Sequence, residues 1–125
     1  HWIQEMVDQP SMVALYAHAA VFCCPSVYEP FGIINIEAMA CETPVVATAV
    51  GGIKEVVQDH KTGCLVPVKL KDGSHKPIDP QKLSKDLADK INTLMKDASS
   101  RAHGPRRPET GAGSLYLASR GPLHI

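Results

Sequence analysis

The chain has 125 residues, of which 44% are hydrophobic and 21% charged, and its thirteen basic side chains are balanced by thirteen acidic ones. This composition is typical of one globular domain, and the balanced charge provides no field that would attract DNA or RNA. No apolar run approaches the roughly 20 residues that a membrane helix requires. We therefore expect a cytoplasmic protein with no nucleic-acid and no membrane partner.

Apolar periodicity and turn signals predict helices and strands that alternate along the chain. Ser11 is the expected N-cap of the first helix. Pro25 ends the first strand because it has no N–H to donate, and Asp79 caps a last helix that begins at Pro80. The expected helices cover about residues 11–20, 33–41, 53–58 and 80–97, and the expected strands cover 21–24, 45–48 and 64–68.

The three expected strands are apolar on both faces, which favours a parallel sheet covered by helices on each side. The fold class is therefore α/β, with a Rossmann-like parallel sheet, flanking helices and right-handed crossovers. We assign residues 1–98 to this partial domain. Residues 99–125 form a predicted disordered tail, because Gly and Pro are frequent there and no helix or strand period is visible.

None of the four cysteines has the Cys-x-x-Cys spacing of a zinc or redox site. Cysteine is among the most often buried residue types and stays reduced inside cells. We expect Cys23, Cys24, Cys41 and Cys64 to be small core residues, and we expect neither a metal nor a cofactor.

Two loops of this sequence follow parallel strands and should therefore emerge at one edge of the sheet. Residues 26–32 follow the first strand and residues 50–52 follow the second. Ligands of such sheets bind at this edge, and the amides of about 31–35, which open the next helix, are suited to an anion such as a diphosphate. The pair Gly51-Gly52 could belong to this site, or could only form a tight turn into a helix.

Glu37 lies in a helix that is otherwise almost entirely apolar, eight positions after Glu29. An ionised carboxylate buried without partners would cost several kcal/mol, so Glu37 needs hydrogen-bond donors or water. Vicinal hydroxyls of a ribose would satisfy it, as in dinucleotide-binding folds. Alternatively, the helix dipole alone stabilises Glu37, and Glu29 is a solvated loop residue.

The stretch SVYEPFGIINIEAMACETPVVATAVGGIKEVV resembles the signature of retaining GT-B glycosyltransferases of the glycogen and starch synthase-like group 4 family. The shared features are a Glu, a Pro-Phe-Gly, a second Glu eight positions after the first, an Ala-Met-Ala helix, a Pro-Val-Val strand and a Gly-Gly loop. The resemblance covers about residues 2–98. Within it, residues 11–68 are most similar to bacterial glycogen synthases.

The resemblance implies a role for six residues of this stretch. Glu29 would be catalytic, lying by the donor sugar and stabilising an oxocarbenium-like transition state by electrostatics. The backbone amides of Phe31, Gly32 and Ile33 would contact the donor hexose. Ile34, at the helix start, would face the diphosphate, and the Glu37 carboxylate would bind the ribose hydroxyls. The family uses no metal.

The implied activity is transfer of glucose from ADP-glucose or UDP-glucose to an α-1,4-glucan, with retention of configuration. The chain matches only the later part of the second of two Rossmann-like domains. The domain that binds the glucan acceptor and the basic residues that grip the diphosphate would precede this match. Two alternatives stay open: another group 4 transferase with a different sugar or acceptor, and a non-catalytic binding or assembly module that keeps the fold.

Overall fold

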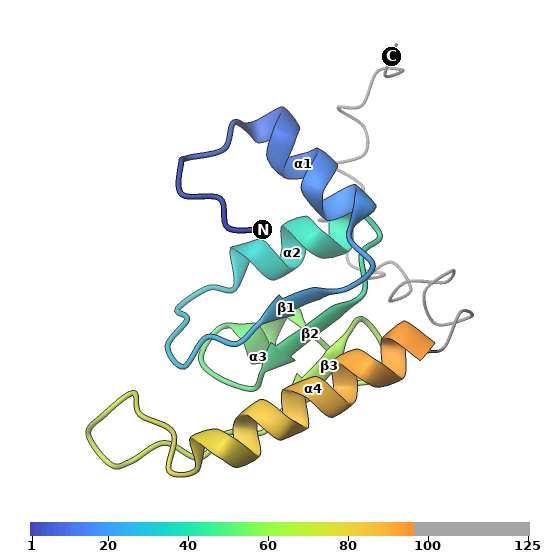
Figure 1. The fold of residues 1–125 in the computed structure, drawn as a ribbon. Coiled ribbons are helices and arrows are strands. Elements are labelled where there is room, and N and C mark those ends of the chain that lie inside the picture. Colours follow the sequence, from blue (N-terminus) through green and yellow to red (C-terminus); the bar gives the residue numbers. More distant parts are fainter. Residues whose placement is uncertain (97–125) are drawn as a thin grey trace.

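A computed structural model describes residues 1–96 of the chain, and these form a three-stranded parallel sheet with helices on both sides (Figure 1). The elements are α1 (Gln9–His18), β1 (Phe22–Cys24), α2 (Ile33–Ala40), β2 (Val45–Thr48), α3 (Ile53–Val56), β3 (Cys64–Val66) and α4 (Pro80–Lys96). The predicted α/β class and the alternation of elements are confirmed. The tail predicted for residues 99–125 lies outside the described residues.

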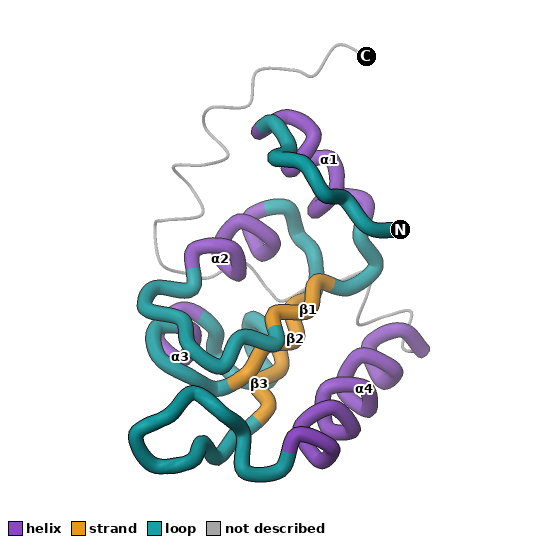
Figure 2. Tube along the Cα trace, turned by 60° about the vertical axis from the view of Figure 1, so that its left-hand side comes forward, coloured by secondary structure: helices purple, strands orange, loops and turns teal. Residues whose placement is uncertain are grey.

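The middle strand, β2, is fully buried because it contributes side chains to two apolar layers. Val45 and Ala47 belong to one cluster, which contains buried residues of α1, α2 and α3. Val46 belongs to the other cluster, with Leu83 and Leu87 of α4. Figure 2 shows α4 on one side of the strands and α1 and α2 on the other. The apolar pattern on both faces of β2 thus reflects a helix layer on each side.

The first helix begins earlier than the sequence predicts, because Asp8 and not Ser11 is its N-cap. The Asp8 carboxylate accepts a hydrogen bond of 2.9 Å from the Ser11 N–H, and Pro10 occupies the first turn. The Ser11 side chain, followed by the Ser11 N–H, lowers the pKa of Asp8 by hydrogen bonding to its carboxylate. Ser and Asp are both good N-caps. With Asp8 as the cap, Pro10 lies in the first turn of the helix, where proline is favoured.

The third strand is shorter than predicted: it ends at Val66, not at residue 68. Pro67 explains the difference, because a proline has no N–H to donate to a neighbouring strand. The third helix is also shorter than predicted, ending at Val56 and not at residue 58. These differences change the ends of the elements and not their order.

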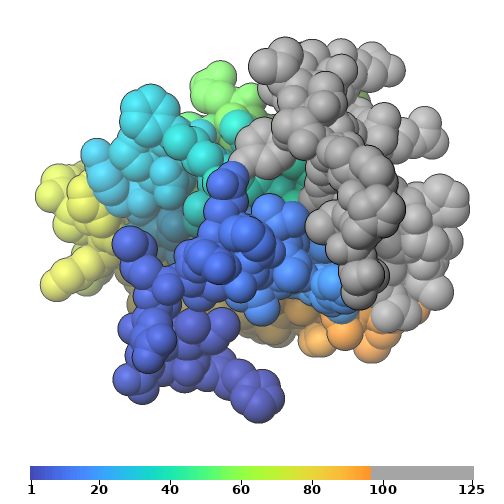
Figure 3. All heavy atoms as spheres, turned by 90° about the horizontal axis from the view of Figure 1, so that it is seen from above, coloured from blue at the N-terminus to red at the C-terminus, as the bar shows by residue number. Residues whose placement is uncertain are grey.

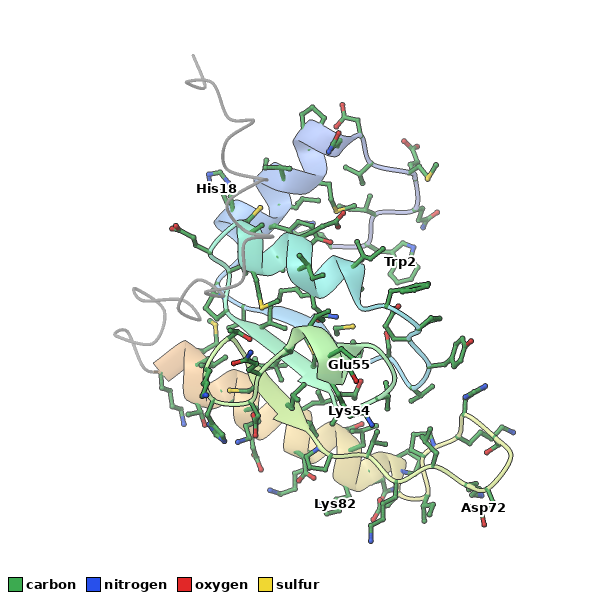
Figure 4. All side chains as sticks on the ribbon, turned by 180° about the vertical axis from the view of Figure 1, so that it is seen from behind. Trp2, His18, Lys54, Glu55, Asp72 and Lys82 are labelled. Atoms are coloured by element: carbon green, nitrogen blue, oxygen red, sulfur yellow. The ribbon has the colours of Figure 1, made fainter. Side chains whose placement is uncertain are left out.

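The last helix, α4, agrees closely with its prediction. The Asp79 carboxylate accepts a hydrogen bond of 2.8 Å from the Lys82 N–H, as expected for a cap. Lys82 lies on the side of α4 that is turned away from the sheet (Figure 4) and pairs with Asp86 one turn later. Within residues 1–96, no helix is both long and apolar enough to cross a lipid bilayer.

Candidate functional site

The two loops that follow β1 and β2 lie in direct contact, as the parallel sheet predicts. The Gly52 N–H donates a hydrogen bond of 2.8 Å to the Glu29 carbonyl. A Cβ atom on Gly51 would lie 2.1 Å from the Glu29 carbonyl oxygen, and one on Gly52 would lie 2.3 Å from that of Pro30. The glycine pair therefore forms more than a turn, because only glycine allows the two backbones to approach this closely.

Thr48, at the end of β2, holds the start of the loop that contains Glu29. Its side chain is fully buried, and its hydroxyl donates to the Ser26 carbonyl and lies 3.4 Å from the Cys24 carbonyl oxygen. Sequence reasoning placed Thr48 only as the last residue of an apolar strand. A buried threonine at a strand end is a signal for such an anchor, because its hydroxyl must find an acceptor.

Replacing Thr48 by valine should lower the free energy of unfolding by about 1 to 2 kcal/mol, because the partly buried Ser26 carbonyl loses its donor. Thr93→Val is the matched control: the Thr93 hydroxyl donates to the Asp89 carbonyl on the exposed surface of α4. Water can replace that bond, so the control should change stability little. Urea unfolding of both variants measures the difference, and equal midpoints would contradict the anchoring role.

Glu29 folds back onto its own loop. One carboxylate oxygen, Oε1, accepts hydrogen bonds from the Phe31 N–H at 3.3 Å and from the Gly32 N–H at 3.1 Å. Gly32, at φ +76°, is the N-cap of α2 and provides no side chain to cap it. The carboxylate therefore satisfies two N–H groups at the start of this helix, where negative charge is favoured.

Apolar side chains are exposed around the start of α2. Phe31 is 71% exposed, Ile33 57% and Ile34 39%. Large apolar side chains gathered in one exposed place often mark a surface that binds something. Three of the residues predicted to contact a donor are thus accessible, whereas Gly32 is buried and Glu37 is half-buried.

The predicted ribose ligand, Glu37, has a partner that the sequence pattern did not indicate. The Tyr16 hydroxyl of α1 donates to Glu37 Oε2 at 3.3 Å. Burial, followed by the charge of Glu37, raises the pKa of Tyr16 to about 12, so Tyr16 stays a neutral donor at ordinary pH. Glu29 and Glu37 therefore have separate partners: Glu29 bonds within its loop, and Glu37 bonds to a different helix.

Asn35, the other polar residue of α2, is completely buried. Its Nδ2 group donates a long hydrogen bond of 3.4 Å to the Gly32 carbonyl. Its Oδ1 atom has no hydrogen-bond partner among the residues that the structure describes. Asn35 therefore ties its own helix to the cap residue.

The loop between β3 and α4 reaches the loop that carries Glu29, which the sequence did not predict. The rings of Tyr28 and His75 lie 4.6 Å apart between centroids. In Figure 3 the residues coloured around position 30 lie beside those of this later loop, and Figure 4 shows Asp72 at its outer end. Nothing in the local sequence pairs Tyr28 with His75, because their contact depends on how the long loop folds back.

The cysteines are all free, and Cys24 is buried while Cys23, Cys41 and Cys64 are half-buried. Burial raises the pKa of the Cys23 and Cys64 thiols. A raised pKa keeps a thiol protonated and therefore weakly nucleophilic. Among residues 1–96, no group of three or more His, Cys, Asp or Glu side chains is placed to hold a metal ion.

The parallel sheet and the two touching loops place Glu29 at the edge where α/β domains generally bind their ligands. Comparison with protein families then gives the class: the family model "Glycosyl transferases group 1" matches residues 1–104, and the chain belongs to this family.

Two curated relatives are similar to this chain, and their names describe different enzymes. The chain is 45% identical over 96 residues to "Alpha-maltose-1-phosphate synthase" of Mycolicibacterium smegmatis, which covers 77% of this chain and 23% of that protein. It is 42% identical over 109 residues to "D-inositol 3-phosphate glycosyltransferase" of Paenarthrobacter aurescens, which covers 87% of this chain and 24% of that protein. The chain thus spans about a quarter of the length of these relatives.

A solved structure of similar sequence is that of Anabaena Alr3699/HepE in complex with UDP-glucose. It is 27% identical, covers 83% of this chain and 28% of its own, and superposes with a TM-score of 0.45. The family assignment confirms the glycosyltransferase part of the prediction, and the two relatives named above have names other than glycogen synthase.

Proposed function

We propose that residues 1–98 are part of the nucleotide-sugar-binding domain of a retaining glycosyltransferase with a GT-B fold. The observation that carries this proposal is the contact between the two loops at one sheet edge, where the Gly52 N–H bonds to the Glu29 carbonyl. That contact fixes Glu29 beside the start of α2, and family membership supplies the reaction class. Residues 99–125 lie outside this domain in the proposal.

In this proposal Glu29 is the catalytic residue, and its carboxylate stabilises positive charge that develops on the donor sugar. Its Oε1 atom bonds to the Phe31 and Gly32 amides, the same amides that we assign to the donor hexose together with that of Ile33. The Glu29 side chain must therefore turn from these amides to the sugar when donor binds. This exchange keeps each N–H group satisfied in both states.

The diphosphate would bind at the first turn of α2, at Ile34, where amides without intrahelical partners and the helix dipole favour an anion. Glu37, one turn further along, would accept hydrogen bonds from the ribose hydroxyls. No metal ion and no cofactor takes part. We place the reaction in the cytoplasm, which the four free cysteines favour.

Two transfer reactions are candidates for this glycosyltransferase. An α-1,4-glucan synthase would use ADP-glucose or UDP-glucose and a glucan acceptor bound by an N-terminal domain. The name of the Mycolicibacterium relative favours a second candidate, synthesis of maltose 1-phosphate. Because maltose 1-phosphate contains a glucose joined to glucose 1-phosphate, the acceptor would then be a sugar phosphate. A non-catalytic module that keeps the fold is the third possibility, and it requires that no acceptor domain accompany residues 1–125.

Glu37→Gln tests the donor site in the complete polypeptide that contains residues 1–125. The variant should weaken binding of the nucleotide-sugar by about 1 to 3 kcal/mol, the range for a lost charge-assisted hydrogen bond. Calorimetric titration with ADP-glucose and with UDP-glucose measures the loss and shows which base is preferred. Stability should change less, because glutamine can still accept from Tyr16.

The matched control is Glu42→Gln, the same change of charge at an exposed residue just beyond the end of α2. It should leave donor affinity unchanged. An unaltered affinity of Glu37→Gln for both donors would instead give Glu37 a purely structural role on α2, and the donor-site proposal would lose its ribose contact.

A further inference from the structure

The hydrogen bond between Tyr16 and Glu37 joins a buried hydroxyl to a half-buried carboxylate across two helices. Tyr16 is 8% exposed, and its hydroxyl lies 3.3 Å from Glu37 Oε2. Glu37 is followed on α2 by Ala38 and Met39, which both belong to the core. The carboxylate therefore lies at the boundary between an apolar layer and the outside, where its direction depends on few polar neighbours.

Tyr16 itself is held firmly, so its hydroxyl occupies a defined position. Its ring packs edge-to-face against Phe22 of β1, with centroids 5.3 Å apart and planes at 84°. Burial and the Glu37 charge raise the pKa of Tyr16 to about 12, which keeps the phenol protonated. A protonated phenol held in one place donates its hydrogen bond to the carboxylate from a fixed direction, and so it can orient the carboxylate.

A carboxylate has two oxygens and about four lone-pair sites. Tyr16 takes one site on Oε2, which leaves the others to accept from a ligand. A pair of vicinal hydroxyls needs both of its acceptors in a set geometry, and a carboxylate free to rotate would lose rotamer entropy on binding. A donor from α1 reduces that freedom before the ligand arrives.

We propose that Tyr16 is a positioning residue that orients Glu37 toward the ribose hydroxyls of the donor nucleotide. The inference rests on the proposed function, because it gives Glu37 a ribose to bind. Tyr16 touches no substrate in this arrangement and acts only through the carboxylate. The competing explanation is that the hydrogen bond merely fastens α1 to α2.

The test measures binding of ADP and UDP, and of their 2′,3′-dideoxy forms, to the complete polypeptide that contains residues 1–125. Tyr16→Phe keeps the ring against Phe22 and removes only the hydroxyl. We expect this variant to bind the better ribonucleotide about three- to tenfold more weakly, a loss typical of one hydrogen bond. It should bind the dideoxy form as the unaltered protein does, since that form has no hydroxyls for Glu37 to accept from.

Thr43→Val is the matched control, because the Thr43 hydroxyl donates to the Tyr16 backbone carbonyl and so fastens α1 to the turn before β2. This variant removes that bond and leaves the Tyr16 hydroxyl on Glu37. It should lower stability in urea and leave both nucleotide affinities unchanged. An equal loss of affinity in Thr43→Val and Tyr16→Phe, or an equal loss for ribose and dideoxyribose, would show that Tyr16 only fastens the helices and would overturn the proposal.

Glu37→Gln separates this inference from the function on which it rests. If Glu37→Gln weakens only ribonucleotide binding while Tyr16→Phe changes nothing, the ribose site stands and the positioning role fails. If Glu37→Gln binds both nucleotide forms normally, the ribose site itself fails. A second measurement needs no variant: with tyrosine labelled at the ζ carbon, the Tyr16 signal should shift on adding the ribonucleotide and not the dideoxy form, and an unmoved signal contradicts the proposal.

Discussion

Residues 1–125 on their own should transfer no detectable glucose and should bind a nucleotide-sugar no more tightly than about 1 mM, roughly −4 kcal/mol. Transfer requires that the donor be closed against an acceptor, because aligning the two sugars and excluding water provide much of the reduction of the barrier. In the proposed function these residues supply the Glu29 loop and the start of α2, which would form one wall of such a site. The diphosphate would then rest on backbone amides in contact with water, where each hydrogen bond adds little net free energy.

The measurement is incubation with radiolabelled ADP-glucose and UDP-glucose, with glycogen in one series and glucose 1-phosphate in another. Amide-shift titration by NMR on the same chain gives the donor affinity. The control is the complete polypeptide under the same conditions, which should be active with one of the two acceptors. Product formed by residues 1–125 alone would show that they contain a complete active site. It would contradict the proposal that they form only one wall of that site.

The order and type of the elements could be predicted because each strand is apolar on both faces and each turn carries its own signal. The ends were harder to place, since they depend on competition between neighbouring residues. Asp8 and Ser11 can both cap a helix, and only the folded chain shows that Asp8 accepts from the Ser11 N–H. Pro67 could have shortened the third strand in the prediction, because its missing N–H is visible in the sequence.

The candidate site was predictable where it depends on strand order and unpredictable where it depends on tertiary packing. A parallel sheet already requires that the loops after β1 and β2 share an edge, and the hydrogen bond from Gly52 to Glu29 fulfils that requirement. The Tyr16 hydroxyl could have been sought as the donor that Glu37 needs, since a buried tyrosine hydroxyl usually finds a partner. Its identity was not fixed by sequence, because the two residues lie 21 positions apart on separate helices.

Gly52→Ala should strongly destabilise the domain, because it forces apart the two loops that define the site. Its Cβ would lie 2.3 Å from the Pro30 carbonyl oxygen and 2.7 Å from the Phe31 Cα, distances at which backbone must move. Gly52 has φ −68°, which alanine adopts without strain, so the expected cost comes from the clash alone. Overpacking and loss of the bond to the Glu29 carbonyl together should lower the free energy of unfolding by about 2 to 4 kcal/mol.

Gly73→Ala is the control that separates this clash from the loss of a glycine. Gly73 has φ +67°, and a Cβ there would meet nothing within 4 Å, so the change costs only backbone strain, about 1 to 2 kcal/mol. Urea unfolding should rank Gly52→Ala below Gly73→Ala, and calorimetric titration of the complete polypeptide should show at least tenfold weaker donor binding for Gly52→Ala alone. The binding loss follows because displacing Pro30 and Phe31 moves Glu29 from the start of α2. Normal donor affinity in a folded Gly52→Ala protein would mean that the contact between the loops does not shape the donor site.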